Sequence, residues 1–178
     1  MNREELISWS EKYDNEEDLY NKGDEKELGD KFRQNNFVTK EDLHKIIKWK
    51  FQGRLIGRRN RVLKLLDNVE GSYIEDASKL AFKYQDDKIR VKLFSTIDGI
   101  GSAITTVILA FYDPKNYGVF DIHAWRGLFG KEPKDLFTNT KHAIHFFDKL
   151  RDISKETGLS CRTIEKAYFK MDLDRSKA

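Results

Sequence analysis

The stretch DGIGSAITTVILAFYDPKNYGVFD, residues 98–121, decides how this chain folds. It opens with Gly99-Ile100-Gly101 and continues as an apolar, helix-like segment that reaches Phe111. A loop with Pro114 follows, and the stretch ends on the carboxylate of Asp121. We expect a helix that ends near Thr96, a tight turn at 98–101 and a second helix from Ser102.

The two glycines suit a turn that binds a phosphate. Glycine adopts positive φ without strain and lets another backbone approach closely. The helix that follows presents amide groups with no intrahelical acceptor, and these bind anions well. Ile100, between the glycines, anchors the turn in the core. The alternative is an ordinary glycine turn between two core helices, because such triplets are common.

Asp121 precedes a predicted helix at 122–129 and suits its N-cap. A carboxylate at a helix N-terminus is favoured in its ionised form. That form suits the stabilisation of a developing cation better than general-base activation of water.

The rest of the chain also indicates helices. Apolar residues recur at helical spacing after Thr39-x-x-Asp42, around Val62–Leu66, after Ser72-x-x-Glu75 and at 89–94. Further helices are predicted at 140–156 and 160–170, the last opened by Ser160 after Gly158. Residues 10–36 are so polar that part of them is expected to be loop or loosely held helix. No segment alternates with period two, so we predict an all-α fold.

Composition excludes several classes of protein. Among 178 residues there is one cysteine, Cys161, which excludes a disulfide framework and a four-cysteine zinc or iron–sulfur site within one chain. No apolar run approaches the ~18 residues of a membrane span. We therefore expect a soluble, cytoplasmic protein without a membrane partner, and a monomer. Cys161 itself is either a thiol of lowered pKa near a helix start or a buried structural residue, and we favour the second.

Positive charge gathers between residues 40 and 64, although the net charge is only +3. This basic strip consists of Lys45, Lys48, Lys50, Arg54, Arg58, Arg59, Arg61 and Lys64. Such a strip can bring a protein onto a phosphate backbone. The alternative is a solvated helix face.

Over about residues 93–128 the sequence resembles the helix–hairpin–helix DNA glycosylase superfamily. The resemblance rests on Ile97-x-Gly99-Ile100-Gly101, Thr105, the Gly/Pro loop at 113–118 and Asp121-x-His123-x-x-Arg126. Asp121 lies twenty positions beyond Gly101, as the family spacing requires. The resemblance implies a two-lobed helical fold. Residues 39–120 form the central lobe, which carries the hairpin at 93–111, and residues 1–38 and 121–178 form the second lobe.

The resemblance also assigns roles. Gly99, Ile100 and Gly101, with the amides of Ser102 and Ala103, would hold one phosphate of double-stranded DNA. A monovalent cation on the carbonyls of the turn is compatible with it. Asp121 would be the catalytic carboxylate of a DNA N-glycosylase of base excision repair, which hydrolyses the bond between the sugar and a flipped-out base.

Two departures from the family pattern carry information. Members with lyase activity place a lysine where this chain has Ala103, and a Schiff base with the sugar needs an amine. Neither Lys92 nor Lys115 lies at a spacing that replaces it, so a monofunctional enzyme is implied. Asp98 stands in place of the usual proline.

Base flipping requires a residue that fills the gap in the duplex and a pocket that holds the base. In the family that the chain resembles, a residue between two early helices, often a glutamine, fills this gap. The resemblance makes Gln52 a candidate wedge, within the run Ile47-Lys48-Trp49-Lys50-Phe51-Gln52-Gly53-Arg54. Trp49, Phe51 and Trp125 are candidates for stacking on the base, and Arg54 for the same pocket. The alternative for the aromatic residues is packing in the core.

Two further alternatives remain. His142 and His145 could form a metal pair on one helix, but no third ligand is evident and we predict no metal site.

The whole chain is alternatively a non-catalytic helix–hairpin–helix DNA-binding module. Such a module has no need of Asp121.

Overall fold

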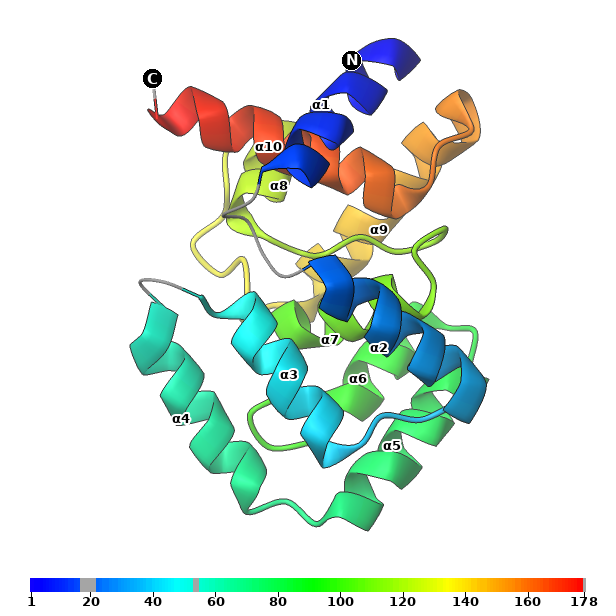
Figure 1. Ribbon diagram of the computed structural model, residues 1–178, viewed down its shortest axis with the longest axis vertical. Helices are drawn as coiled ribbons and strands as arrows, with labels where there is room; N and C mark the ends of the chain where they lie inside the picture. The colour runs from blue at the N-terminus through cyan, green and yellow to red at the C-terminus, as the bar shows by residue number, and fades with distance from the viewer. Residues whose placement is uncertain (17–21, 53–54, 178) are drawn as a thin grey trace. The chain divides into compact units, whose positions relative to one another are not determined.

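The computed structural model describes residues 1–16, 22–52 and 55–177, and in these ranges it contains α-helices and no β-strand. The prediction of an all-α fold is therefore confirmed for the described residues (Figure 1). The helices are α1 (Arg3–Asn15), α2 (Lys22–Asn35), α3 (Lys40–Lys50), α4 (Ile56–Asp67), α5 (Gly71–Lys83), α6 (Asp87–Phe94), α7 (Ser102–Tyr112), α8 (Ile122–Phe129), α9 (Thr140–Thr157) and α10 (Cys161–Lys177).

The helices form two compact units. Unit 1 comprises Met1–Leu19 and Asp113–Ala178, and unit 2 comprises Tyr20–Tyr112. These boundaries differ from the predicted lobes, because α2 belongs with the central helices and residues 113–120 belong with the C-terminal ones. The guanidinium of Arg33 on α2 donates to the carbonyls of Phe111 and Tyr112, both at 2.8 Å. This contact ties α2 to the end of α7.

Unit 2 is built around α7, which packs against α2, α3 and α6 (Figure 1). Every α7 residue from Ser102 to Phe111 is buried. A helix that is apolar on all sides is stable only when neighbours cover it fully. The central place of α7 follows directly from the apolar run that the sequence shows at 102–111.

Unit 1 is built around α10, which packs against α1, α8 and α9 (Figure 1). Gly127 of α8 permits the close crossing, since a Cβ there would lie 2.5 Å from the carbonyl oxygen of Tyr168. At the centre of the unit, Arg162 forms an ion pair with Glu165, and both side chains are almost fully buried. Glu165 also accepts from the amide of Val119 at 3.1 Å. The pair thus fixes the segment that leads to Asp121.

Of the two capping boxes that the sequence predicts, the structure contains one. The capping box of Thr39 and Asp42 is present on α3. The box predicted for Ser72 and Glu75 is wrong, because α5 already begins at Gly71, with Glu70 as its N-cap and no side-chain cap bond.

The polar segment 10–36 is helical at 10–15 and 22–35, and residues 17–21 lie outside the described residues, so the expectation that part of it is loop or loosely held helix stays a prediction. Two large side chains on each helix give it enough buried surface: Leu6 and Tyr13 on α1, Leu28 and Phe32 on α2. The described residues contain no helix long and apolar enough to cross a bilayer.

Candidate functional site

The glycine turn joins α6 to α7 within unit 2. Ile97 and Ile100 are 1% and 3% exposed and hold the turn on the core. The amide of Ile100 donates to the carbonyl of Ile97 at 2.9 Å, and Gly99 adopts a φ of +87°. The turn therefore has the tight geometry that the sequence predicts, with α7 beginning at Ser102.

Gly99 also brings the turn against α4. A Cβ at Gly99 would lie 3.0 Å from the carbonyl oxygen of Val62 and 3.3 Å from Cβ of Leu65. Both the positive φ and this close approach require glycine at the position.

The approach to the turn is open at Gly101. Gly101 is exposed, and a Cβ there would meet nothing within 4 Å. Ser102 and Ala103, by contrast, are only 3% and 7% exposed. The Gly101 carbonyl accepts from the amides of Ile104 and Thr105, both at 3.0 Å, and so begins α7. The candidate phosphate contact is thus at Gly101 and the first amides behind it.

The basic strip divides between two helices. Lys45 on α3 lies 3.6 Å from Glu27, and Lys50 is buried, so these two do not continue one basic surface. On α4 the side chains of Arg58, Arg61 and Lys64 are exposed. Val62 and Leu65 of α4 make the contact to Gly99, so these cations lie on a helix that packs against the turn.

The candidate base-pocket residues lie mostly in the cores. Trp49 is 3% exposed and packs edge-on against Phe111, while Phe51 is 4% exposed beneath the guanidinium of Arg58. Trp125 is 5% exposed, and its Nε1 donates to the carbonyl of Lys131 at 3.1 Å. These three rings therefore pack in the core, which was the alternative to stacking on a base.

The other two candidates for the wedge and base pocket are polar. Gln52 is exposed, so its side chain is accessible as a wedge would require. Arg54 lies outside the described residues.

Asp121 is the N-cap of α8, and its carboxylate accepts from the amide of His123 at 3.0 Å. The residue before it, Phe120, is fully buried, so Asp121 directly follows a residue of the unit 1 core. Asp121 itself is half-buried. Helix α8 runs from Ile122 to Phe129, as predicted.

Charged side chains surround this N-terminus. Nδ1 of His123 lies 2.8 Å from Oδ2 of Asp172 on α10. Arg126 donates to both carboxylate oxygens of Glu132, at 2.9 and 2.7 Å. This hydrogen-bonded pairing lowers the pKa of Glu132 to about 2. The pKa of Arg126 is raised, first by Glu132 and then by the negative charges of Asp172 and Asp121.

The cluster of Asp121, His123, Arg126, Glu132 and Asp172 was only partly foreseeable. His123 and Arg126 belong to the motif that follows Asp121, whereas Glu132 and Asp172 were missed. Asp172 lies 49 positions from His123, and no local signal links the two.

The remaining candidates, His142, His145 and Cys161, contact neighbours within the fold. His142 bonds Asp135 at 3.0 Å, and His145 stacks on Phe129. No group of three possible metal ligands occurs among the described residues. Cys161 is fully buried, and burial raises the pKa of its thiol to about 11, so the alternative of a lowered pKa is wrong.

Comparisons of the chain with protein-family models, with curated proteins and with solved structures gave no match.

Proposed function

We propose that the protein is a DNA N-glycosylase, with Asp121 as its catalytic carboxylate and the turn at Gly99–Gly101 as a contact to the DNA backbone. The glycine turn and the carboxylate follow one another at the spacing that the resemblance requires. The exposed cations of α4, the helix that packs against Gly99, support binding to a polyanion.

The proposed reaction replaces a carbon–nitrogen bond with a carbon–oxygen bond. The target base leaves the stack, because the scissile bond is unreachable inside the duplex. As the base departs with the bonding electron pair, positive charge develops on the sugar, and the carboxylate of Asp121 stabilises it. Water then adds to the same carbon and loses a proton, and the departed base takes up a proton, so the products are the neutral free base and the sugar hydroxyl. Since Ala103 carries no amine, no Schiff base forms at that position.

One observation carries the proposal. Asp121 caps α8 through a bond to the His123 amide, yet it remains half-buried rather than enclosed, within a cluster of charged side chains. An N-cap needs only a hydrogen-bond acceptor. The polar neighbours His123, Arg126 and Asp172 are more than an N-cap requires.

A second candidate is a non-catalytic DNA-binding module. The burial of Trp49, Phe51 and Trp125 favours it, because these rings are covered and offer no stacking surface. Release of a base from DNA separates the two candidates.

The contact at Gly101 is tested by the variant Gly101→Asp. Aspartate is a good N-cap and its Cβ meets open space, so the fold should be retained. Its charge would repel a phosphate, and we expect affinity for duplex DNA to fall by about tenfold or more, equivalent to ~1.4 kcal/mol. Parent affinity should itself fall by on the order of tenfold or more between about 50 and 200 mM salt. Fluorescence anisotropy with a labelled duplex measures both.

The matched control is Gln34→Glu, which makes the same change of charge. Gln34 is exposed on α2, next to Arg33, which bonds the C-terminal end of α7. This control should bind as the parent does. If the parent and Gly101→Asp bind duplex DNA equally, and if salt does not weaken that binding, the turn does not contact DNA. Both candidate functions would then be contradicted.

A further inference from the structure

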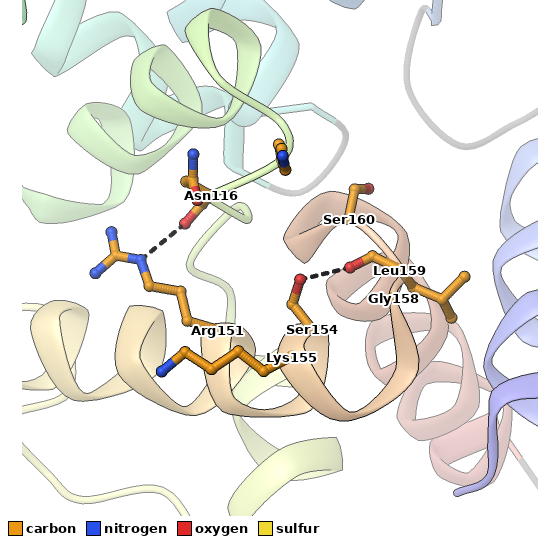
Figure 2. Close-up of a pocket in the computed structure, with 8 residues that line it drawn as sticks. Asn116, Arg151, Ser154, Lys155, Gly158, Leu159 and Ser160 are labelled. Atoms are coloured by element: carbon orange, nitrogen blue, oxygen red, sulfur yellow. Dashed lines mark hydrogen bonds between the residues drawn. The ribbon is translucent and has the colours of Figure 1, made fainter.

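A pocket of about 550 Å³ lies within unit 1, between the loop after α7 and the junction of α9 with α10 (Figure 2). Lys115 and Asn116 line it from the loop, Arg151, Ser154 and Lys155 from α9, and residues 158–160 from the junction. None of these residues belongs to the cluster around Asp121. The volume is within the range of small-molecule sites.

Hydrogen bonds fix the walls of the pocket. The carbonyl of Lys115 accepts from the amide of Cys161 at 3.1 Å, which ties the loop to the start of α10. Ser154 Oγ donates to the carbonyl of Leu159 at 2.6 Å, and Arg151 Nε donates to the carbonyl of Asn116 at 3.3 Å (Figure 2). A ligand would therefore meet a preformed site and would lose little affinity to ordering it.

The lining carries three cations, Lys115, Arg151 and Lys155, and no carboxylate. Lys115 has no ion pair within the described part of the chain. Arg151 and Lys155 lie 3.7 and 3.5 Å from Asp148 and Asp152, whose side chains are more than 60% exposed. Pairs of this length with exposed carboxylates contribute little.

The positive charge of Arg151 also acts on Cys161, a buried residue next to the pocket. Burial is the main cause of the raised pKa of Cys161. The positive charge of Arg151 acts in the opposite direction, and the negative charge of Asp113 adds to the rise. Arg151 is held in place by the carbonyl of Asn116 and by the rings of Tyr117 and Phe147, at 5.0 and 5.7 Å. It is thus a positioned cation rather than a freely rotating one.

We propose that this pocket binds the phosphate group of a phosphorylated ligand. Arginine and lysine side chains give charge-assisted hydrogen bonds to phosphate oxygens, and Ser160 lines the pocket from the junction of α9 with α10. The volume leaves space for the moiety that the phosphate is attached to. The phosphate could be that of a free small molecule or of a nucleic-acid strand. The proposal does not depend on glycosylase activity.

The test uses pyrophosphate as the probe in isothermal titration calorimetry at constant ionic strength. The double variant Lys115→Gln/Lys155→Gln should bind pyrophosphate at least about tenfold more weakly than the parent, equivalent to ~1.4 kcal/mol. The control Lys149→Gln changes an exposed lysine of α9 outside the pocket and should bind within about twofold of the parent. Thermal melting by circular dichroism confirms that each variant is folded.

A second arm, with a 5′-phosphorylated oligonucleotide, identifies the source of the phosphate. Loss of pyrophosphate binding alone in the double variant assigns the pocket to a free phosphorylated molecule. Loss of oligonucleotide binding as well assigns it to a nucleic-acid phosphate. Absence of pyrophosphate binding by the parent, or equal binding by parent and double variant, would overturn the proposal.

Discussion

Asp121→Asn is expected to bind duplex DNA as the parent does and to release the target base more slowly by a factor on the order of 10²–10³. Asparagine keeps an acceptor of nearly the same shape for the amide of His123, so the cap on α8 survives. The negative charge that stabilises the developing sugar cation is lost. Single-turnover base release and anisotropy, measured on the same duplex, separate the chemical step from binding.

The stability of this variant is its internal control. Asparagine and aspartate are comparable N-caps, so the free energy of unfolding should change by no more than about 1 kcal/mol. The exposed aspartate Asp152 provides a matched variant, Asp152→Asn, which should release the base at the parent rate. Full activity of Asp121→Asn would exclude Asp121 from the mechanism.

Glu165→Ala is expected to destabilise the protein by about 3–5 kcal/mol, because it leaves the buried guanidinium of Arg162 without its carboxylate. The Val119 amide loses its acceptor at the same time, so the segment before Asp121 is loosened. Urea denaturation followed by circular dichroism measures the change.

Two further variants show whether the loss of stability in Glu165→Ala comes from the unpaired charge of Arg162. Glu156→Ala removes an exposed carboxylate of α9 and should lie within about 0.5 kcal/mol of the parent. Arg162→Met/Glu165→Leu removes both charges and should be more stable than Glu165→Ala, since an apolar replacement of a buried pair is often neutral. A Glu165→Ala variant as stable as the parent would contradict this account of the unit 1 core.

The sequence predicted those features that neighbouring residues determine. Helix α8 begins after Asp121 and ends at Phe129 because an N-cap lies at one end and Gly130 at the other. Helix α7 begins at Ser102 because the glycine turn ends there. Gly158 ends α9 in a left-handed conformation, as expected for a glycine C-cap.

Features that depend on distant residues were not predicted. The partner of His123 is Asp172, on another helix, and nothing near either residue indicates the pairing. Helix α2 belongs to unit 2 because it packs against α7, where Arg33 also bonds the end of that helix, and periodicity does not reveal this packing. Ser72-x-x-Glu75 has the pattern of a capping box, but the helix already starts one residue earlier, so the serine lies inside it.

The central claim, that this chain cleaves the bond between a base and its sugar, is tested most directly by measuring base release. The protein is incubated with a panel of duplexes that each carry one damaged, mismatched or modified base, and the freed base is identified by mass spectrometry. Alkali then reveals abasic sites as strand breaks. The account predicts a free base and an alkali-sensitive site from at least one duplex, with no covalent protein–DNA product after borohydride. No free base from any duplex at an enzyme concentration that saturates binding would contradict it.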